Sequence, residues 1–392
     1  MANSTYGFKR GVRRTKNKLV SFIATKGKQN IIVIAALALL VLVFAVLNPN
    51  FVDRWNIVSM AQSLAPYAIM ALGVTFVIAT GGIDLSIGTV CIASAVVAGK
   101  FYESGMPLWA TIPVMIGIGT LFGLINGILI AKLKLPAFIA TLGTMMFSRG
   151  LSAIIVAVPN IFYPTGTWFN RIFSNADGIP TGLFWVVGLA IICMYLMYKC
   201  KIGRYILSIG SNEEATRLSG INTDKYKMIA YTLSGMGAGI AAIFWSASFT
   251  TVASATGNGM ELDAIAGVYI GGTSAAGGIA SIAGSVIGSV MLVVIRSGLN
   301  FVLARFDLAL NSTYVTFVLT GIIVVAAVLM DVIKNKNAAK VKLDTEKTLK
   351  KKQRKQALAE KEDEIDEIFS SALPKEEKAE RVRAIEEEIA KL

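Results

Sequence analysis

The chain has 392 residues, of which 54% are hydrophobic and 16% are charged, and its mean hydropathy is +0.62. Soluble domains carry about 25% charged residues, so this composition excludes an ordinary soluble globular protein. The absence of histidine removes the commonest metal ligand and general base, and three cysteines in or beside apolar segments imply no disulfide framework.

Charged residues are unevenly distributed along the chain. Residues 1–333 hold 11 Asp or Glu and 22 Lys or Arg, whereas the last 59 residues hold 14 and 16. We predict a basic cytoplasmic N-terminus at 1–30, a transmembrane domain at 31–333 and a charged cytoplasmic tail at 334–392, either helical or disordered. The net charge of +13 comes largely from basic clusters beside apolar segments. This pattern is typical of the positive-inside rule rather than of nucleic-acid binding.

Apolar segments of membrane length predict an all-α polytopic membrane protein with about ten spans. The predicted spans are residues 31–47, 57–80, 84–99, 108–131, 135–156, 183–198, 228–248, 263–277, 281–300 and 313–333. Basic residues are concentrated before the first span and after the even-numbered spans, so both termini are expected to be cytoplasmic. The first 30 residues are too long and basic for the n-region of a usual signal peptide, so the first span is expected to be uncleaved.

Glycines interrupt the hydrophobic pattern in both halves of the chain. The first break is GGIDLSIG at 81–88, and the second is IGGTSAAGGIASIAG at 270–284. Helix breaks at membrane depth are tolerated only where the freed backbone groups face protein or a water-filled cavity, and paired breaks point to a transport pathway. Tight turns with small-residue packing explain the glycines equally well. The candidate pathway residues are Gly81, Gly82, Asp84, Ser86, Gly271, Gly272 and Ser274.

Asp84 stands between Ile83 and Leu85, where the hydrophobic sequence resumes at once. A carboxylate within a membrane segment costs about 2.5–3.5 kcal/mol on insertion scales, so it normally faces a cavity, a partner or the interface. Asp84 or Ser86 can also cap the third span by accepting its first backbone N–H groups. Capping and lining a pathway are compatible. If Gly82 has a positive φ, valine there is expected to be harmful.

Four segments occur in a familiar order and spacing: GGIDLSIG, LPAFIATLGTMMFSRG at 135–150, IGSNEEATRLSGI at 209–221, and ELDAIAGVYIGGTSAAGGIASIAGSVIG at 261–288. Together they closely resemble the permease subunits of bacterial ATP-binding-cassette importers for simple sugars, in the branched-chain amino acid/sugar permease family. The resemblance covers residues from about 30 to 333. It implies a non-catalytic subunit of the bacterial inner membrane that forms the pathway for a monosaccharide, without a cofactor.

The resemblance also implies three protein partners. These are a second copy of the permease, cytoplasmic ATPase subunits and an extracytoplasmic sugar-binding protein. The chain contains no GxxxxGK(S/T) motif for a nucleotide phosphate, so a partner must hydrolyse the ATP. Membrane lipid is a further expected partner, and nucleic acid is not expected.

The segment SNEEATRLSGI follows the sixth predicted span. Ser211 or Asn212 can cap a short helix there, negative charge on Glu213 and Glu214 suits its first turn, and Gly220 is placed to end it. Judged on its residues alone, the pattern favours an ordinary solvated turn. The family, however, uses a short helix at this place as the coupling helix that sits in a groove of the ATPase. The resemblance therefore implies ATPase contacts by Asn212, Glu213, Glu214, Ala215 and Gly220.

Arg296 departs from the family pattern, in which asparagine residues commonly precede the GLN at 298–300. Its side chain can extend to the outer interface, pair with Asp263 or Glu261, or alter the pathway. Arg149 belongs to the familiar TMMFSRG pattern and is expected to donate structural hydrogen bonds.

Other function classes fit the residues less well. An ion-coupled secondary transporter has similar broken helices, but this transmembrane domain has few ionisable residues for a proton relay. An intramembrane enzyme needs a metal-ligand cluster, a catalytic dyad or a cofactor motif, and the sequence has none with credible spacing. Within the importer class, a nucleoside, a signalling furanose or an amino acid remains an alternative substrate, because related permeases carry these.

Overall fold

The computed structural model describes residues 33–155, 160–253 and 256–306, with scattered positions between 314 and 385. The chain divides into two compact units, Met1–Asp331 and Val332–Leu392. The predicted N-terminal region at 1–30 and most of the tail lie outside the described residues, and the predicted last span at 313–333 is described only in part. The boundaries of these three regions therefore remain predictions.

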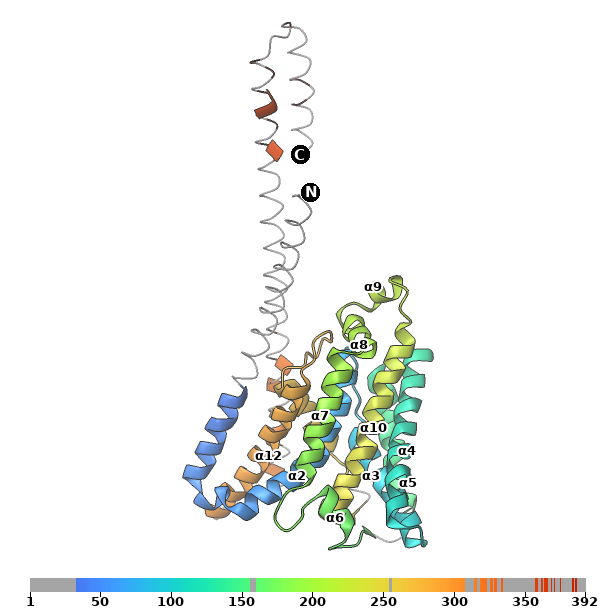
Figure 1. The fold of residues 1–392 in the computed structure, drawn as a ribbon, viewed down its shortest axis with the longest axis vertical. Coiled ribbons are helices and arrows are strands. Elements are labelled where there is room, and N and C mark those ends of the chain that lie inside the picture. The colour runs from blue at the N-terminus through green and yellow to red at the C-terminus, as the bar shows by residue number, and fades with distance from the viewer. Residues whose placement is uncertain are drawn as a thin grey trace, which may run out of the picture. The chain divides into compact units, whose positions relative to one another are not determined.

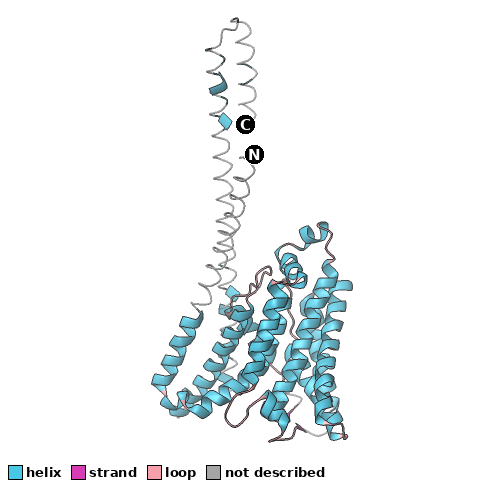
Figure 2. Cartoon of the chain, in the orientation of Figure 1, coloured by secondary structure: helices cyan, strands magenta, loops and turns pink. Residues whose placement is uncertain are grey.

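The first unit is helical, and most of its elements follow the apolar segments of the sequence (Figures 1 and 2). In chain order the described elements are a helix Val33–Leu47, the 3-10 helix η1 (Pro49–Val52), α2 (Arg54–Ala79), α3 (Ile87–Glu103), α4 (Leu108–Gly127), the π-helix η2 (Ile128–Lys132), α5 (Ala137–Ile155), β1 (Ile161–Phe162), α6 (Trp168–Phe173), α7 (Gly182–Tyr198), α8 (Lys201–Ser211), α9 (Glu213–Leu218), α10 (Thr223–Phe249), β2 (Thr251–Val252), α11 (Met260–Ile270) and α12 (Ile282–Arg305). The two short strands pair antiparallel, with Ile161 opposite Val252.

Five of the described helices are long and apolar enough to cross a membrane: α2, α4 with η2, α5, α10 and α12. A sixth candidate is the pair α7 and α8, which is bent by 66° at its break. The helix Val33–Leu47 is apolar but shorter, α3 has 17 residues, and the predicted tenth span is described only in part. The architecture is that of an all-α membrane protein, whereas the number of ten spans remains a prediction.

The predicted eighth span, at 263–277, is wrong in its second half. α11 has 11 residues and ends at Ile270, with Gly271 as its C-cap. Residues 271–281 are non-helical, and their glycines at 272, 277 and 278 have positive φ. An 11-residue helix rises about 16 Å, roughly half of a bilayer's hydrocarbon thickness. The second break is therefore a loop rather than the end of a full span.

α10 lies at the centre of the first unit, packed against α2, α3 and α4. Its contact with α4 is a backbone contact, because a Cβ added at Gly119 or Gly123 of α4 would overlap the backbone of Gly235 in α10. Small residues at a helix interface allow this close approach in membrane proteins. This close contact sets the position of α10 relative to α4.

The two ends of the first unit carry different elements. α6 lies at one end, and α8 and α9 lie at the other (Figure 1). The exposed Arg171 belongs to α6, and the exposed Lys225 lies in the first turn of α10, close to α9 in the chain. Reagents added on one side of a membrane can therefore distinguish the two ends.

We predict that these two positions face opposite sides of the membrane. In a cysteine-free variant, cysteine at Lys225 should react with an impermeant maleimide only in inside-out vesicles, because basic loops assign that end to the cytoplasm. Cysteine at Arg171 should react only in right-side-out vesicles. Labelling of both positions from one side would contradict the orientation.

Candidate functional site

The first break lies between α2 and α3. α2 ends at Ala79, and the segment leads from the exposed Gly81 to Asp84, which is only 1% exposed. Gly81 has a φ of +80°, whereas Gly82 does not lie in the left-handed region. A Cβ added at Gly82 would instead lie 2.5 Å from the hydroxyl oxygen of Tyr231. The conformational freedom is needed at Gly81, and the small size is needed at Gly82.

Asp84 is held by hydrogen bonds from neutral donors. Its Oδ1 accepts the backbone N–H of Ser86 at 3.0 Å and the Ser86 hydroxyl at 2.7 Å, and its Oδ2 accepts the Ser234 hydroxyl at 2.8 Å. Ser86 occupies the N-cap position of α3 without a side-chain cap bond. Its hydroxyl instead donates to Asp84 and accepts from Asn126. Asp84 thus fixes the residue that precedes α3 and links it to α10.

A chain of polar side chains continues from this carboxylate. Asn126 of α4 donates to the Ser86 hydroxyl at 2.9 Å, and Thr144 of α5 donates to the Asn126 carbonyl oxygen at 2.7 Å. A parallel bond joins the hydroxyls of Ser148 and Thr89 at 2.8 Å. The first break is therefore tied to α3, α4, α5 and α10 by buried hydrogen bonds.

Sequence reasoning named Asp84 and Ser86 but missed their partners. A signal for one of them was present, because Asn126 is a lone amide in an apolar helix. Thr144 and Ser148 lie in the segment LPAFIATLGTMMFSRG, which contributed to the family resemblance without a role for these two residues. Ser234 carried no signal beyond its place in a glycine-rich helix.

The second break contacts the first, although about 190 residues separate them in the chain. The backbone N–H of Gly278 donates to the carbonyl oxygen of Ala79 at 3.0 Å. A Cβ added at Gly81 would lie 3.4 Å from the carbonyl oxygen of Ala276. The buried Ser274 closes the loop through its backbone N–H, which donates to Ile279 at 3.0 Å. Of the predicted residues, Gly81 thus meets the second break, while Asp84 and Ser86 are buried among other helices.

Arg296 pairs with Asp263, one of the alternatives left open by the sequence. Its Nη2 donates to Oδ2 of Asp263 at 2.5 Å, and its Nη1 donates to the Tyr67 hydroxyl at 2.8 Å. These bonds join α12 to α11 and α2. Glu261 instead accepts the backbone N–H of Gly259 at 3.2 Å, and its Oε2 has no hydrogen-bond partner among the described residues.

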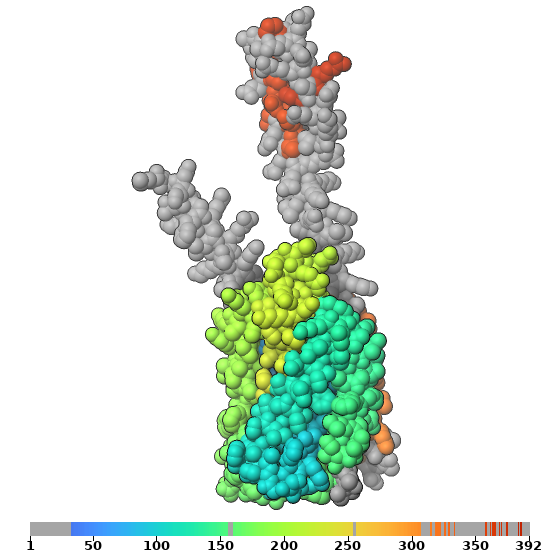
Figure 3. Space-filling model, turned by 90° about the vertical axis from the view of Figure 1, so that its right-hand side faces the viewer, coloured from blue at the N-terminus to red at the C-terminus, as the bar shows by residue number. Residues whose placement is uncertain are grey.

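The short helix after α8 forms as its sequence predicts. Asn212 is its N-cap and accepts the backbone N–H of Ala215 at 2.9 Å, and Glu213 and Glu214 occupy the first turn. Gly220 follows the helix with a φ of +80°. These residues set both ends of the short helix α9, which projects at one end of the first unit (Figure 3).

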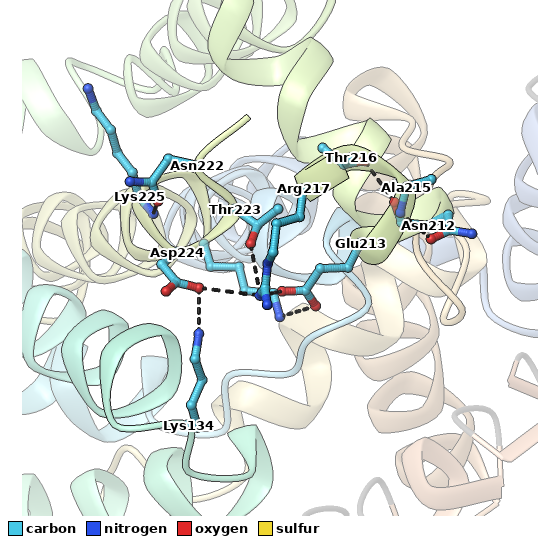
Figure 4. A network of polar contacts seen from close by, with 11 residues as sticks. Lys134, Asn212, Glu213, Ala215, Thr216, Arg217, Asn222, Thr223, Asp224 and Lys225 are labelled. Atoms are coloured by element: carbon cyan, nitrogen blue, oxygen red, sulfur yellow. Dashed lines mark hydrogen bonds and ion pairs between the residues drawn. The ribbon is translucent and has the colours of Figure 1, made fainter. Parts of the chain in front are cut away.

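Charged side chains fasten α9 to α10 and to the residues after η2 (Figure 4). Glu213 accepts from Lys227 at 2.5 Å and lies 3.4 Å from Arg217, while Asp224 accepts from Lys134 at 2.5 Å and lies 3.8 Å from Arg217. Partial burial by itself raises the pKa of Glu213, but Lys227 and then Arg217 outweigh it and hold that pKa below its ordinary value. The carboxylate of Glu213 therefore forms ion pairs with Lys227 and Arg217 of the same chain.

The opposite face of α9 is free for a partner. Glu214 and Ala215 are exposed, and Leu218, at 83%, has the highest exposed fraction of the exposed large apolar side chains in the described part of the chain. An open depression of roughly 400 Å³ lies between α8 and α9, and its lining includes Leu207 and Thr216. Helix and depression together present a partly apolar surface.

The Arg296–Asp263 pair allows a test of stability. Leucine at Asp263 leaves the Arg296 guanidinium without its counter-charge and should lower the free energy of unfolding by about 3–5 kcal/mol. Leucine at both positions removes both charges and should restore most of this loss. Denaturation of the purified protein in detergent measures the difference, and a single variant as stable as the wild type would contradict the pairing.

Comparison with known proteins covers most of the chain. Residues 56–328 match the family model described as branched-chain amino acid transport system / permease component. The ribose import permease protein RbsC of Escherichia coli is 35% identical over 309 residues, which cover 76% of this chain and 91% of that protein. The fructose import permease protein FruF of Bifidobacterium longum is 35% identical over 278 residues, covering 67% of this chain and 78% of that protein.

The L-arabinose transport system permease protein AraH of Escherichia coli is 32% identical over 300 residues, covering 76% of this chain and 89% of that protein. No solved structure matches the chain. The family match spans most of the described helices, from α2 through α12, and therefore includes both breaks and α9. The chain belongs to the family of permease components of the branched-chain amino acid transport system.

Proposed function

We propose that the chain is the transmembrane subunit of an ATP-binding-cassette importer that takes up a monosaccharide. The observation that carries this proposal is its similarity to permeases named for ribose, fructose and arabinose, each matched over at least 78% of its length. A second copy of the chain completes the pathway in the bacterial inner membrane, with both termini in the cytoplasm. A separate ATPase supplies the energy, and an extracytoplasmic binding protein delivers the sugar.

The proposed ATPase contact is the free face of α9. Glu214, Ala215 and Leu218 lie on this face, whereas Glu213 and Arg217 are engaged toward α10. An exposed apolar side chain beside a depression is typical of an interface anchor. Of the residues predicted to contact the ATPase, we therefore assign Glu214 and Ala215 to the contact itself. Asn212, Glu213 and Gly220 set the position and ends of the helix.

The proposed pathway element is the first break. The backbone of this segment is not helical, although it lies among the helices. Membrane proteins tolerate such backbone where the segment is buried in protein or lines a cavity. Asp84 and Ser86 hold this segment through bonds to α4 and α10. At the second break, Gly271 packs closely against Gly284, Gly272 has a positive φ, and Ser274 bonds within the loop. We assign both breaks to the wall of the substrate pathway.

Reconstitution tests the function directly. The permease is placed in proteoliposomes with the ATPase and binding protein encoded beside it, and uptake of labelled D-ribose, D-fructose, L-arabinose and L-leucine is measured. ATP-dependent accumulation of at least one of the monosaccharides, without leucine uptake, is expected. Accumulation of leucine, or sugar uptake driven by an ion gradient without ATP, would overturn the proposal.

Leu218 provides a test of the ATPase contact. Aspartate at Leu218 should weaken association with the ATPase about tenfold or more, because a charge replaces an apolar anchor. Aspartate at Ile179, an apolar residue that is 55% exposed near α6, is the matched control and should bind the ATPase normally. Co-purification from detergent measures both. Equal binding by the two variants would remove α9 from the contact.

Asp84 provides a test of the pathway element. Leucine at Asp84 leaves the Ser86 and Ser234 donors without their acceptor, at a cost of about 1–3 kcal/mol for each buried group, and should abolish most uptake. Asparagine keeps one acceptor oxygen and should retain a substantial part of it. Uptake is compared at matched permease levels. Normal transport by the leucine variant would mean that the first break is only a turn.

A further inference from the structure

The last turn of α8 is in backbone contact with both helix breaks. A Cβ added at Gly210 would overlap the carbonyl oxygen of Ala79, at the end of α2, and the amide nitrogen of Gly278, in the second break. These two backbone atoms are themselves joined by the 3.0 Å hydrogen bond from Gly278 to Ala79. Only a glycine at 210 lets three chain segments meet at this point.

The second break approaches the first at a neighbouring position. A Cβ added at Gly277 would lie 2.7 Å from the amide nitrogen of Gly81 and 2.9 Å from Cα of Gly210. Both Gly277 and Gly81 have positive φ, at +82° and +80°. We call Ala79, Gly81, Gly210, Gly277 and Gly278 the glycine junction. It contains backbone from α2, α8 and the α11–α12 loop.

Tyr198, at the end of α7, also forms hydrogen bonds with the second break and with the start of α12. The Tyr198 hydroxyl donates to the carbonyl oxygen of Ala280 at 3.0 Å and accepts the backbone N–H of Ile282 at 3.1 Å. Tyr198 is the last residue of α7, and Ile282 is the first of α12. The α11–α12 loop therefore has hydrogen-bonded contacts on the side of the junction and on the side of α12.

α9 is joined to the junction without a flexible linker. Asn212 is at once the C-cap of α8 and the N-cap of α9. Gly210 therefore lies three residues before Glu213, the first residue of the proposed ATPase contact helix. A displacement of α9 must move the last turn of α8, and close-packed backbone leaves no space to absorb that movement.

We propose that Gly210 is a positioning residue that transmits the movement of α9 to both helix breaks at once. This inference rests on the proposed function, because it takes α9 as the ATPase contact. When α9 shifts, the last turn of α8 moves the end of α2 and the α11–α12 loop together. The first break then moves at Gly81 and the second at Gly277 and Gly278, so that both walls of the pathway change in one step.

The reconstituted complex with its ATPase and binding protein tests the junction. Alanine at Gly210 forces the three segments apart. The ATPase should co-purify with this variant in the wild-type ratio, but substrate-loaded binding protein should stimulate hydrolysis about tenfold less, and uptake should fall to a similar extent. Alanine at Gly188 of α7, where an added Cβ meets nothing within 4 Å, is the matched control and should behave as wild type.

A second variant decides the question if alanine at Gly210 prevents folding. Phenylalanine at Tyr198 adds no volume and removes the two hydroxyl contacts, and it should reduce stimulation by loaded binding protein about two- to fivefold. Normal stimulation and uptake in a folded Gly210→Ala variant, or in Tyr198→Phe when the first does not fold, would overturn the inference. Failure of the wild-type complex to bind the ATPase would instead overturn the proposed function, so the two failures are distinguishable.

Discussion

Every backbone group that leaves a helix inside an apolar body needs a new hydrogen-bond partner, and this requirement governs both breaks of the permease. Between α2 and α3 the carboxylate of Asp84 accepts a backbone N–H and two hydroxyls. Between α11 and α12 the loop bonds to itself, to Ala79 and to Tyr198. In both breaks, the described non-helical backbone thus has hydrogen-bond partners from other elements.

The cost of burying the Asp84 carboxylate can be compared with the contribution of its hydrogen bonds. Inserting a carboxylate into a membrane segment costs about 2.5–3.5 kcal/mol, whereas a hydrogen bond to a charged group contributes about 1.5–3 kcal/mol. Three such bonds are of a size comparable with this cost. Because Asp84 engages α10 as well as its own loop, the same bonds that stabilise the charge also position the segment.

Much of this architecture could be predicted from the sequence. Both breaks follow from glycines within apolar runs, and the ends of α9 follow from Asn212 and Gly220. The end of α11 at Ile270 was missed because hydropathy continues through small residues whose backbone is not helical.

The partners of the site could not be predicted, because tertiary packing selects them. Ser234 lies 150 residues from Asp84 in the chain, and Asn126 lies 40 from Ser86. The choice of Asp263 over Glu261 by Arg296 depends on how α11 and α12 are rotated against each other, which no local pattern specifies. The contact between the two breaks likewise joins segments about 190 residues apart in the chain.

The central claim is that buried hydrogen bonds, rather than a solvent-exposed turn, hold the segment between α2 and α3. Hydrogen exchange of the Ser86 amide in lipid nanodiscs tests this most directly. Strong protection in the wild type is expected, with faster exchange when Asn126 is replaced by alanine, because Ser86 then loses one of its partners. Exchange of the wild-type Ser86 amide as fast as that of an exposed loop would contradict the account.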